Sequence, residues 1–116
     1  MKSDSEFVPS VRHEGEAVIA TVKGEIDLHN SPQVRTQLLK FLEQHKPKKL
    51  ILNLGGVAYM DSSAIAVLVE ALQKLRKTGG KIYLTDLQPR VKGLLEIARL
   101  DSIFVVCKDE NEALTK

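Results

Sequence analysis

One short stretch of this chain, from Leu50 to Leu54, is apolar at every position except Asn53. A strand with this pattern offers no face to water, and it is typical of a parallel sheet that is covered on both sides. Gly55 and Gly56 follow directly, and we expect them to end the strand, because glycine accepts backbone angles that other residues resist. The stretch therefore predicts an α/β fold in which helices cover a largely parallel sheet.

Strand and helix patterns alternate along the rest of the chain. The segments that predict strands are 7–12, 17–22, 50–54, 81–87 and 103–106, and those that predict helices begin near residues 31, 62, 89 and 109. A glycine-containing turn joins the first two strand candidates, so they predict an antiparallel hairpin, and Gly24 is expected to end or bend the second of them. We therefore expect one α/β domain over residues 7–116, with a mixed sheet and about four helices. A flexible segment over residues 1–6 is expected to precede it.

The second helix pattern begins with residues that suit a helix N-terminus. Asp61 is expected to cap this helix, so that Ser62 and Ser63 occupy its first two positions. The N–H groups there have no intrahelical partner, and the helix dipole adds partial positive charge, so a phosphate could be held at this point. The simpler interpretation is that Asp61 is only a cap and the serines are only polar residues of the first turn. Ser31, which precedes Pro32, is expected to cap the first helix in a similar way.

The composition argues against several classes of function. A net charge of +2 and an aromatic content of 4% do not predict nucleic-acid binding. No Gly-Lys-Ser/Thr ending follows the paired glycines, and the three histidines are scattered, so neither a nucleotide loop nor a nucleophile–base pair is predicted. Asp27 and Asp61 could meet at one end of the sheet, but the sequence offers them no third metal ligand. We therefore expect no catalytic residue, no cofactor and no metal ion.

Cysteine usage and hydropathy bear on the compartment. The single cysteine, Cys107, permits no internal disulfide and lies at the end of an apolar run, so we expect a core position for it. The first residues lack the apolar centre of a signal peptide, and no apolar run reaches the roughly 18 residues of a membrane span. We expect a cytoplasmic protein.

Four short motifs resemble, in order and spacing, those of bacterial anti-sigma factor antagonists, the STAS-domain family. They are the segments 24–27 (Gly-Glu-Ile-Asp), 59–68 (around Asp-Ser-Ser) and 79–80 (Gly-Gly), and a closing pattern made of Pro89, Val91, Leu94 and Leu100. The resemblance extends from about Val8 to the C-terminus. It implies a single STAS-type domain.

The resemblance also implies a partner-switching function. In this family the unmodified antagonist binds an anti-sigma factor that is also a serine kinase, phosphorylation of the serine after the aspartate releases the kinase, and a serine phosphatase resets the switch. The matching position here is Ser62, with Ser63 as the alternative. The residues that the resemblance places at the docking surface are Asp27, Asp61, Ser62 and Ser63, with Ile26 and Met60 as its apolar part.

A second function within the same family stays open. Ala64 and Ala66 stand where many members carry glycine. Alanine is the better helix former, so these residues are expected to stabilise the start of the helix and to narrow a kinase's access to the Ser62 backbone. The chain could therefore be a STAS module that is never phosphorylated, either a scaffold in a signalling complex or the cytosolic subunit of a transporter. Ser62 would then be only a residue of the first helical turn.

Overall fold

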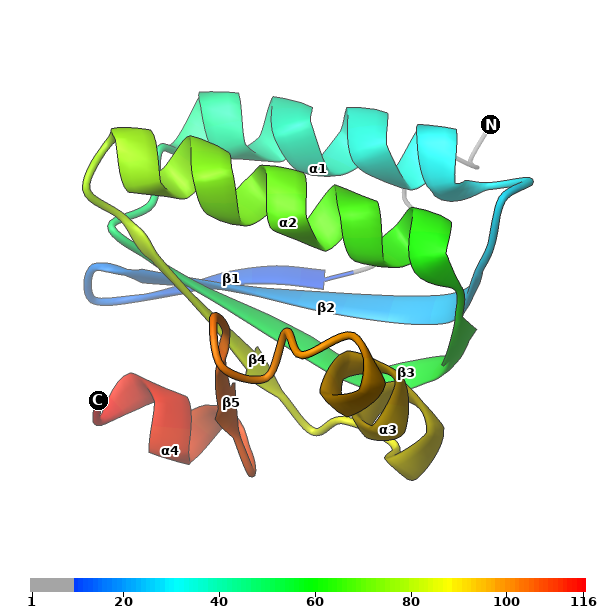
Figure 1. The fold of residues 1–116 in the computed structure, drawn as a ribbon. Helices are drawn as coiled ribbons and strands as arrows, with labels where there is room; N and C mark the ends of the chain where they lie inside the picture. Colours follow the sequence, from blue (N-terminus) through cyan, green and yellow to red (C-terminus); the bar gives the residue numbers. More distant parts are fainter. Residues whose placement is uncertain (1–9) are drawn as a thin grey trace.

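The computed structural model describes residues 10–116, so the segment 1–6 and the first part of the predicted hairpin, 7–9, lie outside the described residues. The elements in chain order are β1 (Ser10–Glu14), β2 (Ala17–Ile26), α1 (Ser31–His45), β3 (Lys49–Met60), α2 (Ser62–Lys77), β4 (Lys81–Thr85), α3 (Pro89–Ile97), β5 (Val105–Cys107) and α4 (Glu110–Leu114). Figure 1 shows their arrangement.

The five strands form one mixed sheet in the order β1-β2-β3-β4-β5. β1 and β2 pair antiparallel as a hairpin, while β2–β3, β3–β4 and β4–β5 pair parallel. The predicted α/β class, the N-terminal hairpin and the four helices are therefore confirmed. No helix within residues 10–116 is long and apolar enough to span a membrane.

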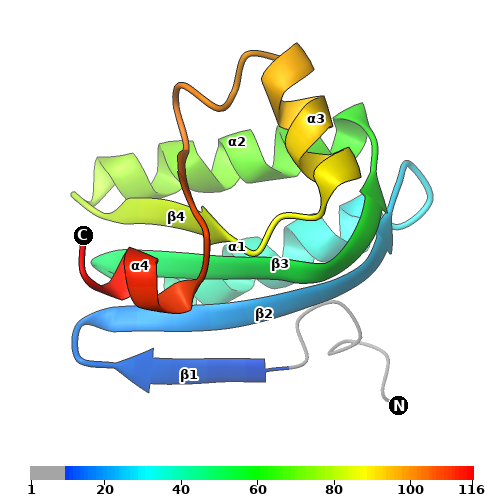
Figure 2. The ribbon, with the colours of Figure 1, turned by 90° about the horizontal axis from the view of Figure 1, so that it is seen from below.

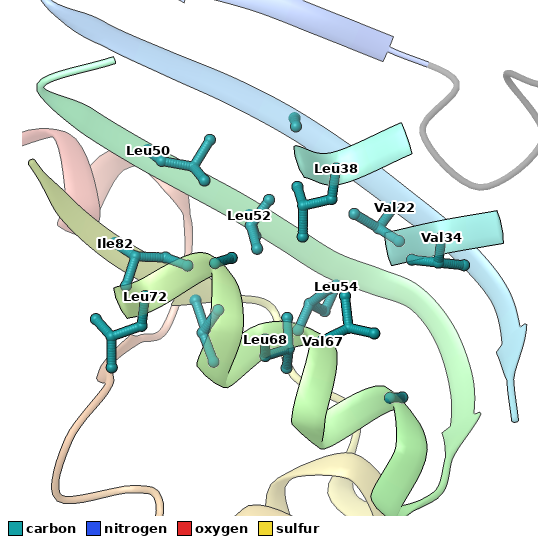
Figure 3. Close-up of a cluster of buried hydrophobic side chains, with 14 of the residues drawn as sticks. Val22, Val34, Leu38, Leu50, Leu52, Leu54, Val67, Leu68, Leu72 and Ile82 are labelled. Atoms are coloured by element: carbon teal, nitrogen blue, oxygen red, sulfur yellow. The ribbon is translucent and has the colours of Figure 1, made fainter. Parts of the chain in front are cut away.

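Helices cover both faces of the sheet. α1 and α2 lie side by side over one face (Figure 1), and α4 lies against the other face (Figure 2). Successive residues of β3 point to opposite faces, so Leu50 and Leu52 enter the core beneath α1 and α2, whereas Ile51 packs with Ala113 of α4. Figure 3 shows the larger core, with side chains of β3 between those of α1 and α2. The two-sided burial predicted from the apolar run is confirmed.

The prediction that the paired glycines end the central strand is wrong. β3 continues through Gly55 and Gly56 to Met60, because β2 continues beside it to Ile26. The register between the two strands shifts on either side of Lys23, as at a β-bulge. A Cβ atom on Gly56 would lie 2.9 Å from the Cβ atom of Lys23, so glycine permits a close approach of the strands here and does not break them.

The first helix begins differently from the prediction. Asn30, not Ser31, occupies its N-cap position, and Ser31 is a buried residue of the first turn. The Asn30 side chain makes no capping hydrogen bond, because its Oδ1 accepts from the backbone N–H of Asp27 and its Nδ2 donates to the carbonyl of Glu25. Asn30 therefore fixes the loop before the helix, and this loop contributes to the candidate site.

Candidate functional site

Asp61 caps the N-terminus of α2, as predicted. Its Oδ1 accepts hydrogen bonds from the backbone N–H groups of Ser63 at 2.9 Å and Ala64 at 3.4 Å. The same oxygen accepts a third hydrogen bond, at 2.6 Å, from the hydroxyl of Ser63. This hydroxyl, helped by the backbone donors, lowers the pKa of the Asp61 carboxyl below its ordinary value. The carboxylate is therefore held in place and in its charged form.

Asp61 also binds the loop between β2 and α1. Its Oδ2 accepts a hydrogen bond of 3.1 Å from the backbone N–H of Leu28, and its own N–H donates to the carbonyl of Ile26 at 3.2 Å. The loop and the start of α2 consequently form one continuous region at the same end of the molecule (Figure 1). We call this region the loop–helix surface and define it as residues 27–30 and 61–63.

The loop part of this surface is internally hydrogen-bonded. Asp27 Oδ1 accepts from the backbone N–H of His29 at 2.9 Å, and the Asp27 carbonyl accepts from the N–H groups of Asn30 and Ser31. The Asn30 side chain bonds to the backbone on both sides of Ile26, at Asp27 and at Glu25. The loop is therefore a defined turn whose shape is set by polar side chains.

The two serines differ in what their hydroxyl groups contact. Ser62 is exposed at the first position of α2, and its hydroxyl has no hydrogen-bond partner among residues 10–116. Ser63 is half-buried, and its hydroxyl donates a hydrogen bond to the Asp61 carboxylate. Of the two hydroxyl groups, that of Ser62 is the one an approaching molecule can reach without breaking a hydrogen bond of the cap.

Two of the predicted docking residues are buried beneath the loop–helix surface. Ile26 and Met60, expected to supply the apolar part of the docking surface, are each only 4% exposed and belong to the main core. They are adjacent on the paired ends of β2 and β3, with their side chains turned under α1 and α2, so they support the loop–helix surface from below. The predicted polar residues Asp27, Asp61, Ser62 and Ser63 do lie together on this surface.

Sequence reasoning missed the apolar residue that the surface does expose. Leu28 is 73% exposed. Leu28 follows Ile26 by two residues, and in a strand two such residues would share a buried face. β2 ends at Ile26, however, so the alternation of a strand does not extend to Leu28. The one sequence signal that could have indicated the exposure of Leu28 is that its neighbours in the chain are polar loop residues.

Among the residues that the structure describes, no group of three or more His, Cys, Asp and Glu side chains could hold a metal ion. Cys107 is buried, as predicted, and burial raises the pKa of its thiol. Asp27 and Asp61 flank Leu28, and hydrogen bonds from the protein's own backbone engage both carboxylates.

Comparison with known protein families assigns the fold. A sequence model of the STAS domain matches residues 8–113, which is nearly the whole chain. The protein belongs to the STAS domain family. The loop–helix surface is thus the end of a STAS domain at which its second strand and its second helix meet.

Two sequence relatives of this STAS domain are both named as antagonists of anti-sigma factors. An anti-sigma F factor antagonist of Paenibacillus polymyxa is 28% identical over 106 residues, which are 91% of each chain. An anti-sigma-B factor antagonist of Bacillus subtilis is 33% identical over 90 residues, 77% of this chain and 81% of that protein.

Solved structures share the fold. An anti-sigma factor antagonist from Mycobacterium paratuberculosis superposes with a TM-score of 0.81 at 23% identity, covering 91% of this chain and 89% of its own. The Bacillus cell fate determinant SpoIIAA in its phosphorylated form superposes with a TM-score of 0.67 at 21% identity, covering 91% of this chain and 96% of its own. At these identities the likeness concerns the STAS fold alone.

Proposed function

We propose that this STAS domain is an anti-sigma factor antagonist that acts by partner switching. In the unmodified state it binds an anti-sigma factor that is also a serine kinase, and it is released when Ser62 is phosphorylated. A serine phosphatase then restores the binding state, and the cycle controls transcription by a sigma factor. The protein acts by binding and not as a catalyst. The names of its sequence relatives support the antagonist role.

The observation that carries the proposal is the state of the Ser62 hydroxyl. It is exposed, and no hydrogen bond within residues 10–116 depends on it, because Asp61 caps the helix with its own carboxylate. A phosphoryl group can therefore be added to Ser62 without removing a contact that stabilises the fold. The positive end of the helix dipole at this position tolerates the added negative charge.

The transfer itself requires the partner's chemistry. The Ser62 oxygen attacks the terminal phosphorus of ATP, the bond from that phosphorus to the ADP oxygen breaks, and a base of the kinase takes the hydroxyl proton. Afterwards Ser62 carries about −1.5 to −2 charge. In an interface this group loses hydration and meets no cation prepared to pair with it, so the partner's affinity falls.

Ser63 is the weaker candidate for the same modification. Its hydroxyl donates to Asp61 at 2.6 Å, so a phosphoryl group there would replace this donor by a negative charge against the carboxylate. Modification of Ser63 would thus disturb the cap, whereas modification of Ser62 would leave it in place.

The test uses the protein with an anti-sigma serine kinase from the same genome and ATP, followed by mass spectrometry of the peptides. We expect one phosphoryl group, located on Ser62, lost in Ser62→Ala and retained in Ser63→Ala. A wild-type protein that binds its partner but stays unmodified would contradict the switch and would favour a STAS module that works without phosphorylation. Loss of phosphate in Ser63→Ala alone would move the site to Ser63.

A further inference from the structure

The loop–helix surface exposes one large apolar side chain, that of Leu28. It is 73% exposed, while its neighbours in the loop, Asp27, His29 and Asn30, are polar. Single exposed leucines are common on protein surfaces, so exposure alone does not indicate a binding role. What sets Leu28 apart is how its backbone is held and what holds it.

The backbone of Leu28 is fixed by the same carboxylate that caps α2. Its N–H donates to Asp61 Oδ2, and on both sides the loop is closed by hydrogen bonds of Asp27 and Asn30. A side chain on such a fixed backbone loses less conformational freedom on binding than one on a mobile loop. The Leu28 side chain is therefore preorganised for binding, and its backbone is bonded to Asp61, the residue that precedes Ser62.

Another exposed apolar residue provides a contrast. Ile97, the last residue of α3, is 83% exposed and so offers at least as much apolar side chain to water as Leu28. No hydrogen bond within residues 10–116 joins it to the loop–helix surface. If exposure alone determined binding, Ile97 and Leu28 would contribute alike, and if the loop–helix surface determines binding, only Leu28 would contribute.

We propose that Leu28 is the apolar anchor by which the anti-sigma partner recognises this protein. The inference rests on the proposed function and adds to it the chemistry of the contact. The partner carries an apolar pocket that accepts the Leu28 side chain, and the rim of this pocket carries a hydrogen-bond donor opposite the half-buried carboxylate of Asp27. The pocket lies beside the place where Ser62 is modified, so one docking event serves both binding and phosphorylation.

The experiment measures the affinity of the partner kinase, in the presence of ADP, for unmodified wild-type protein, Leu28→Ala, Leu28→Met and Ile97→Ala. We expect Leu28→Ala to weaken binding by about 10- to 100-fold, because an anchor's apolar burial is lost. Leu28→Met keeps a side chain of similar volume and should stay within about threefold of wild type. Ile97→Ala should leave the affinity unchanged. All variants should keep the wild-type Tm, because both side chains are exposed.

The outcomes separate the two proposals. Equal affinity of wild type and Leu28→Ala, in a protein that binds its partner and is phosphorylated on Ser62, would overturn the anchor and leave the proposed function standing. Equal losses in Leu28→Ala and Ile97→Ala would also overturn it. A wild-type protein that binds no anti-sigma kinase would overturn the proposed function together with the anchor.

Discussion

The Asp61 carboxylate joins two segments that are 33 residues apart in the chain, since it accepts the backbone N–H of Leu28 at 3.1 Å while it caps α2. One side chain thus sets the position of the β2–α1 loop relative to the helix that carries Ser62. The two parts of the loop–helix surface are therefore joined by a hydrogen bond of this side chain.

Replacement of Asp61 separates its two roles. Asp61→Ala removes the cap and the Leu28 hydrogen bond, and we expect the Tm to fall by a few degrees. Asp61→Asn keeps a capping oxygen, but its amide nitrogen cannot accept from Leu28, so most of the stability should remain while partner binding weakens. Thermal unfolding and titration of both variants with the partner kinase check this. A Tm of Asp61→Ala equal to that of wild type would contradict the role of the cap.

The lowered pKa of Asp61 predicts a direction for the dependence of stability on pH. Because the folded state holds the carboxylate more favourably than the unfolded state, this stabilisation is complete above the unfolded pKa of about 3.9 and is lost as pH falls through the lower folded pKa. The free energy of unfolding of wild type should therefore exceed that of Asp61→Asn at about pH 7, and this difference should shrink as the pH falls below the unfolded pKa of about 3.9. Urea unfolding of both proteins at several pH values measures this difference. A difference in the free energy of unfolding that grows as the pH falls would contradict a lowered pKa for Asp61.

The apolar centre of β3 should dominate stability. Leu52 is fully buried beneath α1 and α2 (Figure 3), so Leu52→Ala should lower the free energy of unfolding by about 2 to 5 kcal/mol. The same substitution at the exposed Leu28 should change it by about 0.5 kcal/mol or less. Denaturant unfolding of the two variants gives both values, and similar losses at the two positions would show that the burial described for β3 is wrong.

Two glycines should respond to alanine in opposite directions. Gly56→Ala should destabilise by about 1 to 3 kcal/mol, because the added Cβ would lie 2.9 Å from Lys23 Cβ and 3.3 Å from the Val22 carbonyl oxygen. Gly93→Ala, within α3, meets no atom within 4 Å and should stabilise by about 0.5 to 1 kcal/mol, because alanine is the better helix former. Chemical denaturation measures both changes. Stabilisation by Gly56→Ala would contradict the close pairing of β2 with β3.

Much of the fold follows from local patterns in the sequence. The apolar stripe with Leu38 predicts α1, and the stripe with Leu68 predicts α2, because each side chain falls on the helix face that turns to the sheet. The end of β3 could not be predicted in this way. Pairing with β2 extends the strand past Gly56, and such pairing between distant segments overrides the local preference of glycine.

The same distinction applies to the site. The cap by Asp61 and the place of Ser62 are local properties of a helix start, so the sequence predicts both. The burial of Ile26 and the exposure of Leu28 depend on where β2 ends and on the hydrogen bond from Leu28 to Asp61, which is distant in the chain. Residue type and spacing therefore do not reveal them.

The most direct test of the central claim is the affinity of the partner kinase for this protein with and without phosphate on Ser62, measured by titration calorimetry in the presence of ADP. We predict that phosphorylation weakens binding by about 100-fold or more, because the charged group must lose its hydration in the interface. Equal affinities of the two forms would contradict the proposal that Ser62 is a switch.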